Sequence, residues 1–171
     1  MMGRLLTVSL VRADGTLRHF CGHVFEFALV SSDGGIATYR ARLRPWSHYL
    51  QLRVNNRLFL GQSLREQSQT LFQEYQAQVP SLRWDWRVQG ADHPITMAVQ
   101  GGGIGESDLN YLRRRWEAAG WLSWWEHSPE AHTLIVADVS HDHCPAIDGD
   151  TAIRFQREGG SQDEDSIATW Q

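Results

Sequence analysis

The residue types best suited to binding a metal are concentrated near the carboxyl end of the chain. Residues 141–144 read His-Asp-His-Cys, and His127 and His132 lie a short distance before them. Zinc in proteins prefers imidazole and thiolate ligands arranged as a tetrahedron. The spacing H-x-H-C is not a usual zinc spacing, however, and Pro145 follows at once. We therefore interpret the segment as a solvated loop, and we predict neither a metal nor any other cofactor.

Signals of catalysis are weak throughout the chain. No G-x-S-x-G sequence is present, which is the turn that exposes a nucleophilic serine in many hydrolases. The glycine-rich stretch at 101–105 precedes an expected helix, but it lacks the Lys-Ser/Thr pair of a phosphate-binding loop and does not fit G-x-G-x-x-G. We interpret it as a flexible loop, and we predict a structural protein without catalytic residues rather than an enzyme.

Three arginines form a basic stripe. Arg40, Arg42 and Arg44 alternate along one expected strand, and Trp46 follows at the same spacing. Single-stranded nucleic acid binds to grooves that combine such charges with aromatic side chains. The chain has a net charge of −4, however, and so lacks a broad positive field. We expect no nucleic-acid partner, and we treat these four residues as candidates for a contact with another protein subunit, the alternative being a solvated face.

Tryptophan is frequent, with eight in 171 residues. This side chain is common in cores and enriched at interfaces. Trp121 and Trp125 share one face of an expected strand, and Trp124 points to the other. One face then belongs to the core and the other to an interface, so Trp121 and Trp125 join the candidate interface residues. The alternative function is a carbohydrate-binding module in which these rings stack on sugars.

The amino-terminal part reads as three antiparallel strands. Residues 7–12, 16–30 and 36–44 are extended and partly alternating, with turn signals at Asp14-Gly15 and at 33–35. Gly22 inside the long strand indicates a bulge or a bend. Such a meander commonly begins a small barrel or a sandwich. The apolar run at 57–60 is predicted to be buried.

Two helices interrupt the strands. Ser63 and Glu66 form a capping box, which predicts a helix over 64–78. Ser107 can cap a second helix, and Gly120 suits its end. Further strands are expected at 82–88, 95–99, 121–126, 133–138 and 153–155. This order predicts an α+β fold with mostly antiparallel pairing. We divide it into a first β segment (1–60), a helical and strand insertion (61–120), a second β segment (121–157) and a mobile acidic tail (158–171).

Composition and termini bound the class of protein. Hydrophobic residues make up 42% of the chain and charged residues 21%, which is ordinary for a globular protein. Only Cys21 and Cys144 are present, so one disulfide is conceivable but a disulfide framework is not, and the count fits a reducing cytoplasm. The first ten residues contain no long apolar run. We therefore predict neither a signal peptide nor a membrane span.

Several segments, taken in order, resemble one known family. The strand at 17–24 (LRHFCGHV) fits its pattern of an aromatic residue followed by x-G-x-V, and 39–46 (YRARLRPW) is similar to Y-x-L-x-L-x-P. Residues 57–63 (RLFLGQS) resemble R-I-F-x-x-x-S, and 106–112 (ESDLNYL) resemble E-S-D-x-x-F-L. Residues 120–127 (GWLSWWEH) and 132–138 (HTLIVAD) are similar to G-I-x-Y-x-F-E-H and H-x-L-V-L-x-D. The family is VgrG, the spike-hub proteins of bacterial type VI secretion systems.

The resemblance implies a fold like the phage baseplate hub, with small β-barrels and helical insertions. It implies a homotrimer whose pseudo-sixfold ring lies between a tube of Hcp and a membrane-puncturing tip, with effector proteins as further partners. It also implies synthesis in the bacterial cytoplasm and export by the type VI apparatus without a signal peptide. VgrG proteins normally begin some tens of residues earlier and continue into an OB-fold and a triangular β-helix. We therefore expect a hub-region fragment that is monomeric or weakly associating by itself, the alternative being a phage-tail hub relative.

Overall fold

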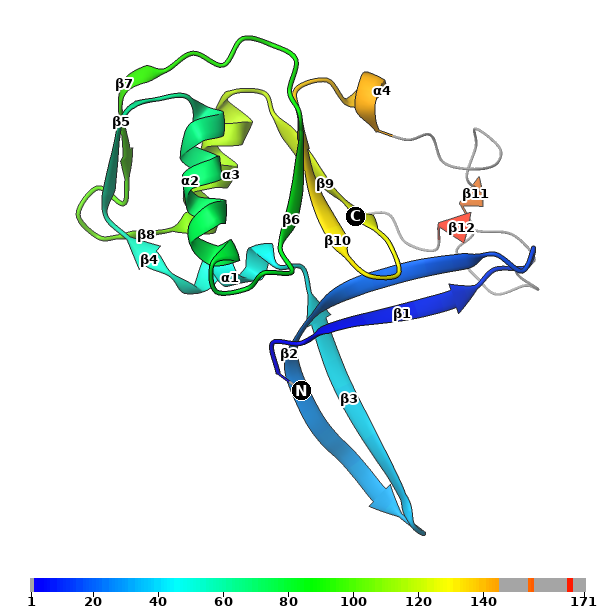
Figure 1. Ribbon diagram of the computed structural model, residues 1–171. Coiled ribbons are helices and arrows are strands. Elements are labelled where there is room, and N and C mark those ends of the chain that lie inside the picture. Colours follow the sequence, from blue (N-terminus) through cyan, green and yellow to red (C-terminus); the bar gives the residue numbers. More distant parts are fainter. Residues whose placement is uncertain (1, 145–153, 156–165, 168–171) are drawn as a thin grey trace. The chain divides into compact units, whose positions relative to one another are not determined.

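The fold is that of a computed structural model, which describes residues 2–144, 154–155 and 166–167 (Figure 1). The chain divides into two compact units, 1–140 and 141–171. In the second unit the short strands β11 (Arg154–Phe155) and β12 (Ser166–Ile167) pair in parallel. The rest of the predicted tail lies outside the described residues, and the four-part division made from the sequence remains a prediction.

The three predicted amino-terminal strands form one antiparallel sheet in the order β1-β2-β3. Their bounds are Leu5–Val11, Leu17–Asp33 and Ile36–Arg44. The long middle strand serves both neighbours, because its first part pairs with β1 and the part from His23 onward pairs with β3. Two hairpins therefore leave the same strand in different directions, as Figure 1 shows. Gly15, at φ 83°, provides the predicted turn of the first hairpin.

The irregularity expected at Gly22 occurs slightly further along the strand. The register with β3 shifts between Val24 and Glu26, and again between Leu29 and Ser31. Gly22 itself has a different role, because a Cβ atom there would lie 3.1 Å from the carbonyl oxygen of Arg44. The missing side chain thus allows the end of β3 to approach β2 closely.

A second three-stranded sheet has β10 (His132–Ala137) in its centre. β9 (Leu122–His127) pairs with it antiparallel, and β6 (Arg83–Arg87) pairs with it in parallel. Two small antiparallel ladders complete the first unit. β4 (Val54–Asn55) pairs with β8 (Glu106–Ser107), and β5 pairs with β7, whose bounds are Arg57–Gln62 and Ile95–Gln100. The predicted α+β class with mostly antiparallel pairing is therefore confirmed, and closure of the sheets into barrels remains a prediction.

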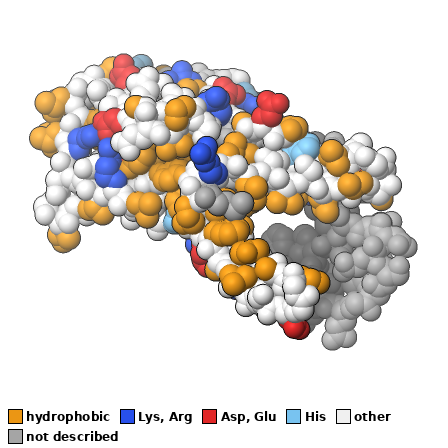
Figure 2. All heavy atoms as spheres, turned by 60° about the horizontal axis from the view of Figure 1, so that its bottom comes forward, with side chains coloured by type: hydrophobic (Ala, Val, Ile, Leu, Met, Phe, Trp, Pro, Cys, Tyr) orange, Lys and Arg blue, Asp and Glu red, His pale blue; other side chains and the backbone are white. Residues whose placement is uncertain are grey.

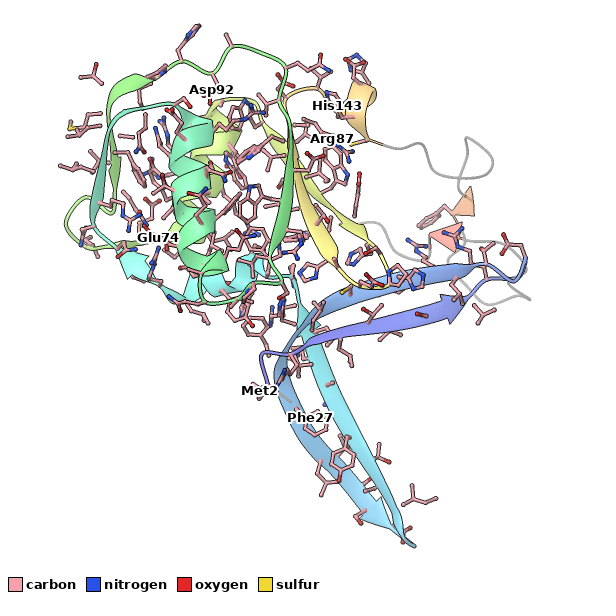
Figure 3. All side chains as sticks on the ribbon, in the orientation of Figure 1. Met2, Phe27, Glu74, Arg87, Asp92 and His143 are labelled. Carbon is pink, nitrogen blue, oxygen red and sulfur yellow. The ribbon has the colours of Figure 1, made fainter. Side chains whose placement is uncertain are left out.

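The predicted helices begin where their capping residues place them. α2 (Leu64–Gln76) has the complete capping box of Ser63 and Glu66. α3 (Asp108–Ala118) begins with the Ser107 side chain accepting the N–H of the third helical residue. Two short helices, α1 (Ser47–Leu52) and α4 (Ser140–His143), complete the helices of the described residues. Asp92, which is labelled in Figure 3, adds a second cap by accepting the first two N–H groups of α2.

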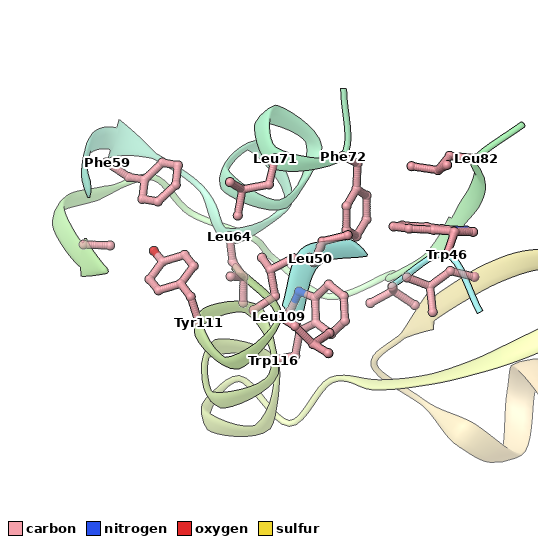
Figure 4. Close-up of a cluster of buried hydrophobic side chains, with 14 residues drawn as sticks. Trp46, Leu50, Phe59, Leu64, Leu71, Phe72, Leu82, Leu109, Tyr111 and Trp116 are labelled. Carbon is pink, nitrogen blue, oxygen red and sulfur yellow. The ribbon is translucent and has the colours of Figure 1, made fainter. Parts of the chain in front are cut away.

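One hydrophobic core joins these elements in the first unit (Figure 4). Helices α2 and α3 pack against each other, and the strands β5, β6, β7 and β10 supply side chains around them. The buried cluster consists of Trp46, Leu50, Phe59, Leu64, Leu71, Phe72, Leu82, Ala98, Leu109, Tyr111, Leu112, Trp116, Leu134 and Val136. Because residues from 46 to 136 share this cluster, β10, the α2–α3 pair and the start of α1 form one body.

Candidate subunit interface

Trp46 was predicted to lie at an interface, and the structure corrects this. Its side chain is 0% exposed, and its ring contacts those of Phe72 and Trp125 at centroid distances of 5.0 and 5.5 Å. The indole N–H donates to the carbonyl oxygen of Arg83 at 3.0 Å. The alternation that grouped it with the arginines stops at Pro45, where β3 ends and the chain turns into α1. Trp46 therefore leaves the strand face and enters the core.

Trp121 and Trp125 are partly buried and pack against the core, as expected for one face of this segment. The Trp125 ring lies 5.0 Å from that of His132, and the Trp121 ring lies 6.2 Å from that of Trp86. On the opposite face, the Arg87 guanidinium lies 5.6 Å from the Trp124 ring centroid. The rings of Trp121 and Trp125 thus pack against other aromatic side chains of the same chain, and the carbohydrate-binding alternative remains a prediction. Any contact of these two residues with another subunit remains a prediction.

Arg40, Arg42 and Arg44 lie exposed on β3, on the face opposite Tyr39. Arg42 forms an ion pair with Glu26 across the hairpin, with an N–O distance of 3.0 Å. Both partners are about half exposed, so the pair contributes little to stability. The stripe is solvated in the single chain, and its role in an interface remains a prediction.

The opposite face of the same hairpin is apolar and also exposed. Phe27, Leu29 and Tyr39 lie on it, and the rings of Phe27 and Tyr39 stack at a centroid distance of 5.3 Å. Figure 3 labels Phe27 on this hairpin, and Figure 2 shows hydrophobic side chains exposed along the hairpins. We call these three residues the arm face. A ring stack that no core covers is typical of a surface that contacts a partner.

A second exposed apolar surface was not predicted from the sequence. The run at 57–60 was predicted to be buried, but only Phe59 of its apolar residues is. Leu58 pairs with Val99 and Leu60 with Met97 on the outer side of the β5–β7 ladder. These four side chains, which we call the ribbon face, are between 43% and 64% exposed. The prediction took the apolar run as a sign of burial. Side chains of a strand alternate between its two sides, however, and this two-stranded ladder has only one side against the core.

A buried carboxylate holds the ladder to the helices. Asp108 is 0% exposed and accepts hydrogen bonds from four side chains. The donors are Arg53 Nε at 2.7 Å, Asn55 Nδ2 at 3.0 Å, Tyr75 OH at 2.7 Å and Gln100 Nε2 at 2.7 Å. They come from the end of α1, from β4, from α2 and from β7. The Asp in the ESD motif therefore ties four elements to the start of α3.

The charge of Asp108 is stabilised by these donors. Burial alone would raise the pKa of this carboxyl, but the hydrogen bonds from Gln100, Tyr75, Asn55 and Arg53 outweigh burial and lower the pKa. Burial, with the hydrogen bond to Asp108 adding to it, raises the pKa of Tyr75. Asp108 is therefore ionised and Tyr75 neutral at neutral pH, which is the state in which all four hydrogen bonds form.

Glu74 extends the same network to the ribbon. Its carboxylate accepts from Arg53 at 2.6 Å and from Arg57 of β5 at 2.8 Å. Figure 3 labels Glu74 on α2. Because Arg57 is opposite Gln100 in the β5–β7 register, the first pair of the ladder is anchored from both strands. The β5–β7 ladder is thus tied to α2 through Arg57 and to the start of α3 through Gln100.

The part of the chain that the structure describes contains no group of three or more His, Cys, Asp or Glu side chains placed to hold a metal. His141 instead contacts Asp142, with an N–O distance of 3.2 Å. Cys21 is buried, Cys144 is exposed, and both are free thiols. No helix within the described ranges has the length and hydrophobicity needed to cross a membrane.

The fold and the whole sequence define the class of protein. The chain belongs to the phage tail baseplate hub family, whose sequence profile matches residues 1–171. It is 26% identical over 150 residues to the type VI secretion system spike protein VgrG1a of Pseudomonas aeruginosa, which covers 84% of this chain. It is 24% identical over 179 residues to VgrG1c of the same species, which covers 99% of this chain.

A solved structure shows the same fold. The E. coli c3393 protein, described as a component of the type VI secretion system with structural similarity to the T4 phage tail proteins gp27 and gp5, superposes with a TM-score of 0.69. The match covers 80% of this chain and 37% of that one at 19% sequence identity. The chain spans about a fifth of the length of the spike proteins it matches, namely 21% of VgrG1a and 22% of VgrG1c. The predicted resemblance to VgrG and the hub-like fold are confirmed.

Proposed function

We propose that this chain is a structural part of a type VI secretion spike, in which copies of it form the hub and dock on the Hcp tube. The observation that supports this best is the hub-family match over all 171 residues. A hub must be rigid and must offer large surfaces for contact, and it needs no reactive pocket. Synthesis in the bacterial cytoplasm, export through the type VI apparatus, and effector proteins as further cargo belong to the same proposal.

The ribbon face is the surface we assign to the contact between copies. Leu58, Leu60, Met97 and Val99 form two cross-strand pairs on one side of a ladder, so their apolar area is contiguous. Contiguous exposed apolar surface on a soluble protein commonly marks an interface. The Asp108 and Glu74 network fixes the ladder from its other side. The arm face and Arg40, Arg42 and Arg44 lie on a separate hairpin, which we assign to the contact with Hcp.

A charge on the ribbon face is expected to weaken the self-association of the chain. The Leu60→Asp variant should weaken the association of the isolated chain by at least about tenfold, because burying a carboxylate among apolar side chains is costly. Sedimentation velocity measures this at concentrations high enough for the unsubstituted chain to associate. Ile104→Asp is the matched control, since Ile104 is 98% exposed and lies outside both faces. If Leu60→Asp associates like the unsubstituted chain, the ribbon face is not the contact.

The same measurement tests the assembly as a whole. We expect the isolated chain to be monomeric or weakly associating, because it spans only about a fifth of its relatives' length and the remainder would add further contacts. A stable trimer at micromolar concentration would contradict this expectation. Adding Hcp rings should produce a larger species, and Tyr39→Asp on the arm face should reduce its amount. No binding of Hcp by the unsubstituted chain would count against the docking part of the proposal.

A further inference from the structure

Two histidine rings of the β9–β10 hairpin accept backbone hydrogen bonds from β2 and from the residue that follows β3. His132 Nε2 accepts the N–H of Trp46 at 2.9 Å, and His127 Nδ1 accepts the N–H of Cys21 at 3.0 Å. The two histidines face each other as a cross-strand pair. Trp46 follows β3 and Cys21 belongs to β2. The hydrogen bond from Cys21 therefore joins the first sheet to the second, and the one from Trp46 holds the chain just after β3 against β10.

A third histidine completes the junction. His23 of β2 is 0% exposed, and its ring lies 5.3 Å from that of His132. Its Nε2 atom is 2.9 Å from the Ser81 hydroxyl. The His127 and His132 rings are 6.2 Å apart, so His132 has an imidazole neighbour on each side. The Trp125 ring also packs against the His132 ring, at a centroid distance of 5.0 Å. His132 is therefore buried, with 1% of its surface exposed.

The closed junction requires two of these rings to be neutral. A doubly protonated imidazole has two N–H donors and no acceptor, so His132 cannot carry a proton on Nε2 and still accept from Trp46. The same holds for His127 and the N–H of Cys21. Protonation would leave a buried backbone N–H without its partner and would place positive charges within a few ångströms of one another.

No described neighbour compensates for such a charge. Within the described residues, no carboxylate forms a hydrogen bond or an ion pair with the three rings. The titratable and charged groups around the junction come from five elements. They are Arg18 and Cys21 of β2, Arg44 of β3, Tyr49 of α1, Arg83 of β6, and Glu126 of β9, which is paired with Arg87. Burial lowers the pKa of His132 to about 4, and the charges of His23 and His127 add to this effect. Burial also lowers the pKa values of His23 and of His127.

We propose that His23, His127 and His132 form an acid-sensitive latch, which holds the β1–β2–β3 sheet to the β9–β10 hairpin when neutral and releases it when protonated. The direction follows from proton binding. When the junction is open, these histidines titrate near 6.5, whereas the closed form takes up protons only at lower pH. The closed form is therefore favoured fully above pH 6.5 and loses stability progressively as the pH falls toward 4. This device goes beyond the proposed assembly role and does not depend on it.

The test follows backbone amides by hydrogen exchange between pH 7.5 and pH 4.5, with rates corrected for the intrinsic effect of pH. The amides of Trp46 and Cys21 should lose protection together below pH 6.5, while those of Leu71 and Leu112 in the helical core stay protected. The His132→Gln variant keeps an acceptor oxygen for Trp46 but cannot titrate. It should move the pH at which protection is lost downward by about one unit.

Two further variants keep the result interpretable. His127→Asn places its amide oxygen near the position of Nδ1, and it should give a smaller downward shift even if His132→Gln folds poorly. His93→Gln is the matched control, since His93 is exposed and lies outside the junction. The latch is wrong if both junction variants open at the pH of the unsubstituted chain. It is also wrong if the core amides lose protection together with Trp46, because the acid effect would then be global unfolding.

Discussion

Replacing Asp108 by asparagine is expected to lower the free energy of unfolding by about 3 kcal/mol. Removing one partner of a buried ion pair leaves the other groups without compensation, which typically costs about 3–5 kcal/mol. The lower end applies here because Arg53 is 35% exposed on its side chain and keeps its hydrogen bond to Glu74. The asparagine would also direct an NH₂ group at donors, so at least one hydrogen bond becomes a clash of two donors.

Urea unfolding at pH 7 measures this change in the free energy of unfolding. The comparison holds when the slope of that free energy against urea concentration is the same for both proteins. Glu117→Gln is the matched control because it removes an exposed carboxylate from the same helix. We expect the control to remain within about 0.5 kcal/mol of the unsubstituted chain. A similarly small effect for Asp108→Asn would show that the network does not anchor α3.

The same substitution changes the response to acid. The pKa of Asp108 is lowered from 3.8 in the folded chain, so its stabilising contribution is complete above pH 3.8 and is lost as the pH falls through the lowered folded value. The Asp108→Asn variant should therefore lose less stability than the unsubstituted chain below about pH 4. This range lies below the range in which the histidine latch opens, so the two effects are separable in one pH series.

Replacing Trp46 by alanine is expected to lower the free energy of unfolding by about 3–5 kcal/mol. The side chain is fully buried among Phe72, Trp84 and Trp125, and its removal leaves a cavity that the strands and helices around it cannot close. The carbonyl oxygen of Arg83 also loses its indole donor. If Trp46 instead served a surface contact, the isolated chain would be nearly unaffected.

Thermal and urea unfolding distinguish these outcomes. Trp46→Phe should cost less than Trp46→Ala, because the phenyl ring fills part of the space while the hydrogen bond to Arg83 is still lost. Ile104→Ala is the control, because it removes apolar side-chain atoms from an exposed position and therefore leaves no cavity. It should change the free energy of unfolding by less than about 0.5 kcal/mol. Equal effects of Trp46→Ala and Ile104→Ala would contradict the placement of Trp46 in the core.

Local signals in the sequence were enough to place most elements. Ser63 and Glu66 predicted the start of α2, and Ser107 predicted the start of α3, because capping depends only on residues within one turn. Asp14-Gly15 predicted a hairpin turn for the same reason, since a positive φ is a property of the residue itself. The ordered motifs predicted the family, which the match over residues 1–171 confirms.

Contacts between distant segments could not be predicted in the same way. Alternation indicated that Leu58 and Leu60 share a face, but only the folded chain shows that α2 and α3 cover Phe59 and leave the other side open. The parallel pairing of β6 with β10 joins residues about fifty positions apart, for which no local signal exists.

Asp108 shows the difference most clearly. The sequence is enough to place Asp108 at the start of a helix, because an acidic side chain in the first turn interacts favourably with the helix dipole. Its four donors come from positions 53, 55, 75 and 100, and nothing in the local sequence brings them together. The sequence by itself determined which segments become helices and strands, through interactions within a few residues. The tertiary structure decided which side chains are buried, paired or left for a partner, because burial depends on what packs against a face and not on the face alone.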